Sequence, residues 1–266
     1  MPYEDVNLIP LYVSIGVSAL LAVVSVWKKV LTIPATALAV VVLIAVSLFT
    51  GYAGLIAFSV SFLGAGIIGL IKKDLRRERE QGLYPHAGAR RVVQVLVNSL
   101  PSLTFGLVYF LSGKIGFLYA SCVAVTAGFS DSAASDIGIL SKGKVVSILT
   151  FKKVPRGISG GISLAGTISA LLASVAVAVC VFASPEIEAN GIWIIALGGF
   201  IGTLVDSVLG ASIQRCYKCN ICEELTERLN HCGAPTTLVK GLCFIDNNVV
   251  NLLSQFIAAG ISLLFL

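Results

Sequence analysis

The sequence has 266 residues, of which 56% are hydrophobic and only 12% are charged. Its mean hydropathy of +0.93 excludes an ordinary soluble protein, since soluble domains average about 45–50% apolar residues. A membrane-spanning helix needs about 20 mostly apolar residues. Eight windows qualify, near residues 8–27, 31–49, 51–71, 92–112, 115–130, 159–183, 191–211 and 246–266. We therefore predict an all-α protein, a polytopic bundle of about eight transmembrane helices, with residues 1–266 as a single integral membrane domain.

Basic residues gather in every second junction between these windows. With the N-terminus outside, every Lys and Arg except Lys114 falls at the inner ends of the spans. We expect both termini outside, cytosolic loops near 72–91, 131–158 and 212–245, and, from the compact length, a prokaryotic cell membrane. The net charge of +5 follows from this topology and suits anionic membrane lipids. It is not an indication of nucleic acid binding.

Two carboxylates follow the fifth window in the stretch "TAGFSDSAASDIGIL", residues 126–140. Asp131 and Ser135 are four residues apart and share a helix face, with Asp136 beside Ser135. Such oxygen atoms can hold a hard cation such as Mg²⁺. The alternative is that Asp131 only caps a cytosolic helix, because Ser130, Asp131 and Ser132 are all residue types that favour N-cap positions.

The next polar stretch, "KKVPRGISGGISLAGTISA", leads into the sixth window. Lys152, Lys153 and Arg156 precede a Gly/Ser turn, where small residues let backbone amides approach a ligand. The positive dipole end of the following helix then favours phosphate. The order of a Walker A loop is absent, and glycines that enter a transmembrane helix commonly serve packing instead.

The seventh window contains "GGFIGTLVDSVLGASIQ", with Asp206 near its cytosolic end. Gly198, Gly202, Asp206 and Gly210 recur every four residues and form one narrow helix face. This face permits close helix contact and carries a single carboxylate. Asp206 is therefore either a ligand or a hydrogen-bonded group inside a small-residue packing stripe.

The last predicted loop is rich in cysteine. Its candidate ligands are Cys216, Cys219, Cys222, His231 and Cys232. This set is large enough for a tetrahedral structural Zn²⁺ site, although the spacing departs from common zinc-finger patterns. Free reduced thiols are an equal alternative, and an iron–sulfur cluster is a weaker one.

The eighth window begins with "DNNVVN". Asp246, Asn247 and Asn248 are expected helix caps, whereas Asn251 lies one turn further inside the span. Four polar clusters from separate loops thus meet at one predicted membrane face. They supply acids for a metal ion and bases for phosphate.

The runs "RRVVQVLVNSLPS", "SDSAASDIGILS", "KKVPRGISGGISLAGT", "GTLVDSVLGASIQ" and "DNNVVN" occur in this order. In roughly residues 30–266 the chain resembles the membrane family called domain of unknown function ninety-two, which includes the phytyl phosphate kinase of plants and cyanobacteria and a human multispan relative. The usual "ADTWASEIG" element reads "SDSAASDIG" here, so Asp136 replaces a glutamate and Ala133–Ala134 lacks the aromatic. In the "QVLANG"-type element, Ser99 replaces glycine.

The resemblance implies transfer of a phosphoryl group from a nucleoside triphosphate, CTP being favoured, to a phytyl- or geranylgeranyl-type monophosphate lipid. It implies a fold related to the CTP-dependent prenol and dolichol kinases. The implied catalytic residues are Asp131, Asp136, Lys153 and Asp206, with Asp131 and Asp136 as Mg²⁺ ligands. The implied triphosphate site comprises Arg156, Gly157, Ser159, Gly160 and Gly161. The implied substrate-site lining is Gln94, Asn98, Ser135, Asp246, Asn247 and Asn251.

A lipid or small-molecule transporter or flippase is the alternative, because eight spans with glycine-rich helices could also build a carrier. Transporter sites lie near the bilayer midplane at broken helices and between repeated halves. Here the ionisable residues cluster at the predicted cytosolic boundary, and no repeat between halves is evident. A purely structural scaffold would leave the gathered acids unexplained.

Overall fold

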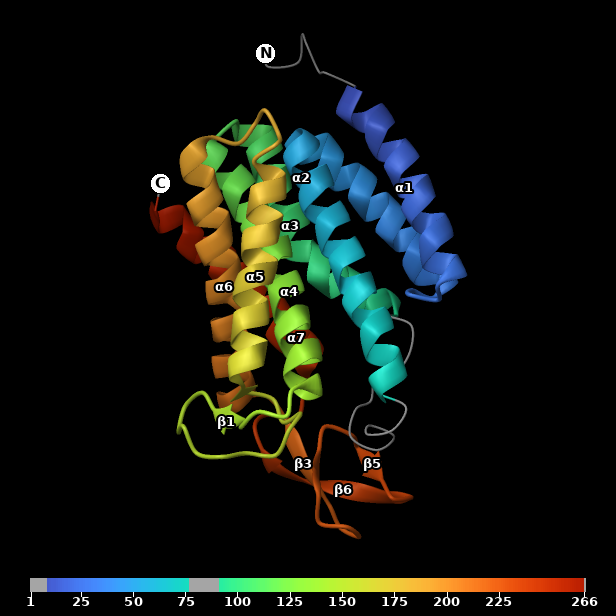
Figure 1. Ribbon diagram of the computed structural model, residues 1–266, viewed down its shortest axis with the longest axis vertical. Helices are drawn as coiled ribbons and strands as arrows, with labels where there is room; N and C mark the ends of the chain where they lie inside the picture. The colour runs from blue at the N-terminus through green and yellow to red at the C-terminus, as the bar shows by residue number, and fades with distance from the viewer. Residues whose placement is uncertain (1–8, 77–90, 266) are drawn as a thin grey trace.

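The computed structural model describes residues 9–76 and 91–265, which form a helical bundle with strands at one end (Figure 1). The helices are α1 (Ile9–Trp27), α2 (Ile33–Arg76), α3 (Val92–Ser112), α4 (Ile115–Leu140), α5 (Leu164–Val181), α6 (Ala189–Ser212), α7 (Asn247–Ser262) and the short η1 (Leu263–Phe265). Within the described ranges, five helices are long and apolar enough to cross a membrane, namely Ile33–Gly69, Val92–Ser112, Leu164–Val181, Ala189–Ser212 and Asn247–Phe265. Leu11–Trp27 is apolar but shorter. The prediction of about eight spans is not confirmed by this criterion.

Helix α2 consists of two helical segments that meet at Gly51. This glycine has φ 63° and ψ −141°, a backbone conformation that L-residues with a side chain rarely adopt. Figure 1 shows the ribbon rising to this point and then descending towards Arg76. The Glu186 carboxylate lies at the turn, where Oε1 accepts a hydrogen bond from the Tyr52 amide at 3.1 Å. A negative group at the start of the second segment complements the helix dipole there.

Six short strands in the described residues correct the all-α prediction. β1 (Val146–Ser147) and β2 (Gly161–Ile162) pair antiparallel. β3 (Cys216–Cys219), β4 (Leu225–Thr226), β5 (Asn230–His231) and β6 (Ala234–Lys240) form a four-stranded antiparallel sheet in the order β4-β3-β6-β5. Both sheets lie at the same end of the bundle, which we call the strand-bearing end (Figure 1). The β5–β6 hairpin turns through Cys232 and Gly233, both at positive φ, as a two-residue hairpin turn requires.

The predicted loop boundaries need two corrections. The segment 131–140, predicted as the start of a loop, is the last part of α4. The segment 212–245 carries the four-stranded sheet instead of being irregular. In the predicted loop 72–91, α2 continues to Arg76, and residues 77–90 lie outside the described part of the chain.

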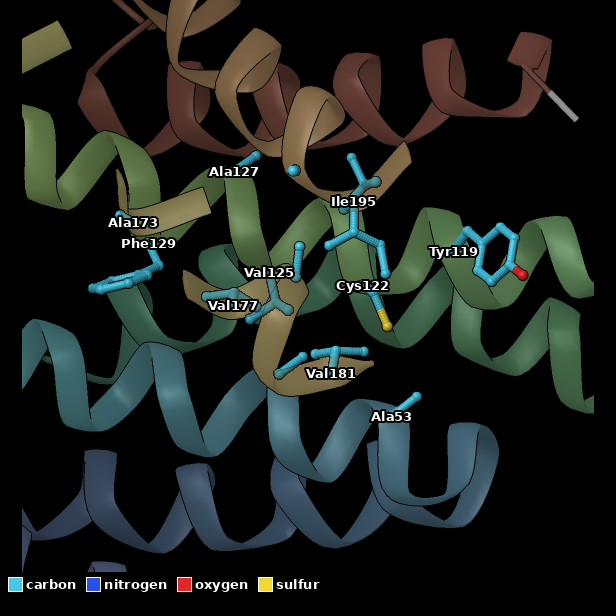
Figure 2. Close-up of a cluster of buried hydrophobic side chains, with 14 of the residues drawn as sticks. Ala53, Tyr119, Cys122, Val125, Ala127, Phe129, Ala173, Val177, Val181 and Ile195 are labelled. Carbon is cyan, nitrogen blue, oxygen red and sulfur yellow. The ribbon is translucent and has the colours of Figure 1, made fainter. Parts of the chain in front are cut away.

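Helix α4 is the central helix, since it contacts α2, α3, α5, α6 and α7. Small and medium side chains of α4 fill the core together with residues of α5 and α6, as Figure 2 shows for Cys122, Val125, Val177 and Ile195. A helix enclosed by others need not be uniformly apolar, because it has little contact with lipid. This accounts for the polar residues of α4, and it places them next to five other helices.

Candidate functional site

The carboxylates of Asp131 on α4 and Asp206 on α6 lie close enough to interact electrostatically, and Asp136 also acts on Asp131. Asp206 is buried, with 9% exposure. The two helices approach closely one turn before the acids, where the Gly202 backbone meets Ala127. Ala127 and Asp131 are four residues apart, as are Gly202 and Asp206, so each pair lies on one helix face. The contact between small residues therefore sets the spacing of the two carboxylates.

Helix α7 orients the Asp206 side chain. Ser254 Oγ donates a hydrogen bond to Asp206 Oδ2 at 3.0 Å. With its amide nitrogen turned towards α6, Asn251 donates to the same oxygen at 3.0 Å and to the Asn247 carbonyl at 3.1 Å. Both donors engage Oδ2, which leaves Oδ1 as the oxygen that faces away from them. Two hydrogen bonds to one oxygen fix the orientation of the Asp206 carboxylate.

A further polar pair crosses the bundle beside the acids. Gln255 Nε2 on α7 donates to Asn98 Oδ1 on α3 at 3.0 Å. The Gln255 amide rests against Gly128 of α4, where a Cβ would lie 3.0 Å from Nε2. Among the described residues, Gln255 Oε1, Ser130 Oγ and Thr203 Oγ1 are buried without a protein partner. Buried polar atoms are normally bonded, so Gln255 Oε1, beside the contact with Asn98, offers hydrogen-bonding capacity next to the acids.

Glu227 joins the site from the four-stranded sheet, although it was absent from the sequence prediction. It lies between β4 and β5. Its Oε1 accepts hydrogen bonds from Ser159 Oγ and from Gln214 Nε2, the latter at 2.9 Å. Burial raises the pKa of the Glu227 carboxyl above its ordinary value, while Ser159 and the charge of Arg215 act in the opposite direction. Glu227 also acts electrostatically on Asp206, so this loop contributes a fourth acid to the neighbourhood.

The predicted Gly/Ser phosphate loop docks on the end of α6. Gly160 has φ 82°, and a Cβ there would lie less than 3.0 Å from Ala211. Gly161 belongs to β2, and Gly157 is also at positive φ, 82°. The close packing of the loop against α6 therefore explains why position 160 is a glycine. Ser163 caps α5 by accepting a hydrogen bond from the Gly166 amide at 3.2 Å.

The two predicted phosphate-binding cations occupy different environments. The Arg156 guanidinium donates to the carbonyls of Ser141 and Gly143, to the latter at 2.8 Å, and so ties the start of the loop after α4 to its end. Lys153 is exposed. Arg156 thus has a clear structural contact, whereas Lys153 projects from the loop surface.

The remaining predicted lining residues are spread along the strand-bearing end. Gln94 Oε1 accepts from the Arg91 amide at 3.0 Å, within a capping box that begins α3. Ser135 is exposed on α4. Asp246 is the N-cap of α7, where Oδ1 accepts from the amides of Asn248 and Val249, and Oδ2 lies 3.6 Å from an Arg215 nitrogen.

A second cluster lies in the four-stranded sheet. One ligand atom each of Cys219, Cys222, His231 and Cys232 lies within 4.8 Å of the others. Cys216 is outside this group, and its sulfur lies 3.9 Å from the Tyr217 carbonyl oxygen. Backbone amides, that of Cys222 first, lower the pKa of Cys219 to about 6. Hydrogen bonding to Cys222 raises the pKa of Cys232 to about 11.

Two site residues that were not predicted, Ser254 and Gln255, do leave a signal in the sequence. Ser254 and Gln255 continue the Asn247 and Asn251 face of α7 at helical spacing, and this regular polar stripe inside an apolar window was visible in the sequence. Glu227 had no such signal. It sits in a polar loop with other charged residues, and only the folded sheet directs it towards α6.

These features define a class: an integral membrane helical protein with an acidic, partly buried site at one end of its bundle. The family model described as "Integral membrane protein DUF92" matches residues 16–259, and the chain belongs to that family. It is 28% identical over 226 residues to Protein PGR of Arabidopsis thaliana, covering 73% of this chain and 75% of that protein.

Two further relatives match over shorter lengths. Over 153 residues the chain is 29% identical to Protein VTE6, chloroplastic, of Arabidopsis thaliana, covering 54% of this chain and 45% of that protein. It is 28% identical, also over 153 residues, to Uncharacterized membrane protein MJ0933 of Methanocaldococcus jannaschii, covering 56% of this chain and 62% of the other. No solved structure matches the chain.

Proposed function

We propose that this protein phosphorylates a polyprenyl monophosphate, of phytyl or geranylgeranyl type, to the diphosphate with a nucleoside triphosphate, CTP being favoured. The observation that carries the proposal is the meeting of Asp131 and Asp206 at one end of an apolar bundle, with Asp136 and Glu227 nearby. Ionisable groups in membrane helices are costly and commonly mark functional sites. Membership of a family that includes phytyl phosphate kinase supports the choice of reaction.

The donor set fits Mg²⁺, a hard cation that prefers carboxylate oxygens. Asp131, Asp136 and Asp206 would hold it, with Asp206 already oriented by Ser254 and Asn251. When bound, the ion supplies positive charge that offsets the charge of the phosphates. Phosphoryl transfer needs mainly positioning and charge neutralisation from the protein, and a set of acids on α4 and α6, with Asp206 oriented by α7, suits that requirement.

The transfer itself needs no base from the protein. An anionic oxygen of the lipid monophosphate attacks the γ-phosphorus, and the bond from that phosphorus to the bridging β–γ oxygen breaks. The electron pair leaves with the nucleoside diphosphate, and the lipid gains a new P–O–P linkage. A monophosphate is largely dianionic near pH 7, so no proton has to be removed first.

The chain's own groups would position the two substrates. Lys153, Arg156 and the amides of Gly157–Gly161 lie just before the N-terminus of α5, whose positive dipole end favours a triphosphate. Asn98 and Gln255, whose side chains bridge α3 and α7, would face the lipid substrate. Gln94, Ser135, Asp246 and Asn247 would line the outer part of the site. The isoprenoid tail would extend between helices into the bilayer.

We also propose eight membrane crossings with the strand-bearing end in the cytosol of a prokaryotic cell. The described residues form eight α-helical segments when α2 is counted as two and the short η1 is left out. An even number suits termini on the same, outer side. The basic loop residues support the cytosolic assignment of the strand-bearing end by the positive-inside rule, and nucleoside triphosphates are available on that side.

The test is a direct assay of the purified protein in detergent. Geranylgeranyl, phytyl and farnesyl monophosphates are each incubated with Mg²⁺ and each of four nucleoside triphosphates, and prenyl diphosphate is measured by mass spectrometry. We expect product from the parent and a loss of about 10²-fold or more in Asp131→Asn and Asp206→Asn. Glu188→Gln is the matched control, because this exposed acid begins α6 at the opposite end of that helix.

A folded parent protein that forms no diphosphate with any substrate pair would refute the kinase proposal. Reconstitution into vesicles would then test the lipid-transport alternative. Equal loss of activity in Glu188→Gln would instead show that the acid substitutions act through general destabilisation.

A further inference from the structure

We propose that Cys219, Cys222, His231 and Cys232 bind one Zn²⁺ and thereby fix the sheet segment that carries Glu227. The sulfur atoms of Cys222 and Cys232 lie 3.4 and 3.3 Å from His231 Nδ1, and all four ligand atoms lie within 4.8 Å of one another. Tetrahedral zinc with Zn–S of about 2.3 Å and Zn–N of about 2.0–2.1 Å implies S···N of about 3.6 Å and S···S of about 3.8 Å. The two S···N distances are close to this value, and a limit of 4.8 Å on every pair leaves only small side-chain movements for one zinc ion to be bound.

Two turns bring the ligands together. The turn after β3 carries Cys219 and Cys222, and the Ile221 amide donates to the Cys219 sulfur at 3.4 Å. Amide donors at a sulfur atom favour the thiolate, which is the metal-binding form. This turn is closed by backbone hydrogen bonds between Cys219 and both Glu223 and Glu224, at 3.0 and 2.9 Å.

The second turn joins β5 to β6. His231 ends β5, and Cys232 and Gly233 form the two-residue turn with φ 52° and 78°. Asn, Asp and Gly are the usual residues at such positions, because positive φ is unfavourable for other side chains. A cysteine in this strained position is explained if its sulfur is needed as a ligand.

The sheet needs such a crosslink because it has little core of its own. β4 and β5 have two residues each. Among the described residues from Arg215 to Phe244, only Cys216, Tyr217, Cys219 and Thr226 are buried. Ile221, Leu229, Val239 and Phe244 are exposed instead. Small units with few buried apolar residues are commonly held by a metal or by disulfides, and the cysteines here are unpaired thiols.

The chemistry favours zinc over the alternatives. Three thiols and one imidazole form a Cys₃His set, a common structural zinc site. An iron–sulfur cluster would spread its ligands around several iron atoms, whereas these four atoms surround a space suited to one ion. A disulfide would use two of the three thiols and would leave the His231 contacts without a role.

The four ligands lie on both sides of Glu227 in the sequence, so metal binding would affect the position of this acid. Cys222 precedes Glu227 and His231 follows it, so one ion would close both ends of the segment that carries the acid. Glu227 in turn accepts hydrogen bonds from Ser159 in the Gly/Ser loop and from Gln214 at the end of α6. The ion would therefore hold the contact between the sheet and the helical bundle that Glu227 makes.

The test measures metal directly and does not depend on kinase activity. The full-length protein is purified in detergent, and zinc, iron and protein are quantified by elemental and amino-acid analysis. We expect one zinc per chain in the parent and loss of that zinc in Cys219→Ser and Cys232→Ser. Cys243→Ser is the matched control, since Cys243 is an exposed thiol of the same segment outside the cluster, and it should retain full zinc content.

A second measurement covers variants that fail to fold. Zinc is removed from the parent with a chelator and replaced by Co²⁺, which should give the visible bands of tetrahedral cobalt and a thiolate charge-transfer band at one equivalent. Removal of the metal should also make the segment 220–232 more sensitive to limited proteolysis, and added zinc should reverse this. Absence of zinc in the parent together with failure to bind Co²⁺, or iron in place of zinc, would overturn the proposal.

Discussion

The substitution Gly202→Ala tests whether helix contact sets the spacing of Asp131 and Asp206. A Cβ at position 202 would lie less than 3.0 Å from the Ala127 Cβ and 3.1 Å from the Ala258 Cβ, whereas carbon atoms in contact stand about 3.5–4.0 Å apart. Overpacking of this kind costs about 1–3 kcal/mol, and the higher helix propensity of alanine returns about 1 kcal/mol. We expect the free energy of unfolding to fall by up to ~2 kcal/mol, and α4 and α6 to separate one turn from the acids.

The assay combines thermal unfolding in detergent with prenyl diphosphate formation. At about 2–4 °C per kcal/mol for a chain of this size, Gly202→Ala should lower the melting temperature and reduce product. Gly66→Ala, at a helical glycine with nothing near its Cβ position, should raise the melting temperature and leave activity unchanged. Adding Ala127→Gly to Gly202→Ala removes the closer of the two methyl groups and should restore part of the activity. Unchanged activity in Gly202→Ala would refute the link between helix spacing and the acid pair.

Three further predictions concern other parts of the fold. Burial raises the pKa of the Glu227 carboxyl, so protonation of this group stabilises the folded protein. This contribution to the free energy of unfolding is complete below the unfolded pKa of about 4.3 and is lost as pH rises through the folded pKa. The melting temperature of Glu227→Gln relative to the parent should therefore rise with pH across that window, and a constant difference would contradict this. Glu186→Ala should cost about 1 kcal/mol in thermal melts at neutral pH, because the Tyr52 amide at the α2 turn loses its acceptor. Gly160→Ala should cost about 1–2 kcal/mol for its backbone conformation and about 1–3 kcal/mol for the clash with α6, whereas Gly113→Ala, at φ 67° in open space, should cost only the first amount.

The helices could be predicted because apolar length alone determines them. The windows 92–112 and 191–211 match α3 and α6 closely, and the break between the second and third windows falls at Gly51, where the two segments of α2 meet. The end of α4 could not be predicted in the same way. Residues 131–140 are too polar for a lipid-facing helix, but contacts with α5, such as the hydrogen bond from Ser169 to the Ala133 carbonyl, keep them helical.

The site was predictable where it lies on helices and not where it depends on the sheet. Asp131, Asp206 and Asn251 stood out as polar residues in apolar surroundings, a signal that comes from the high cost of burying them. The sheet gives no comparable signal, because its strands have two to seven residues and β4 and β5 are too short for an alternating pattern. Glu227 and the exclusion of Cys216 from the ligand group both depend on the register of these strands.

The site residues come both from the helices and from the strand-bearing end, and this arrangement bears on the choice between an enzyme and a carrier. A carrier must expose its site alternately to both sides of the membrane, which favours polar groups near the midplane on elements that move. Here Asp206 is held by α7, Glu227 joins the sheet to Ser159 of the Gly/Ser loop and to Gln214 after α6, and Gly160 packs on the end of α6. Contacts that join so many segments at one end favour a fixed geometry. Such a geometry suits phosphoryl transfer, in which the protein's main task is to hold charged groups in place.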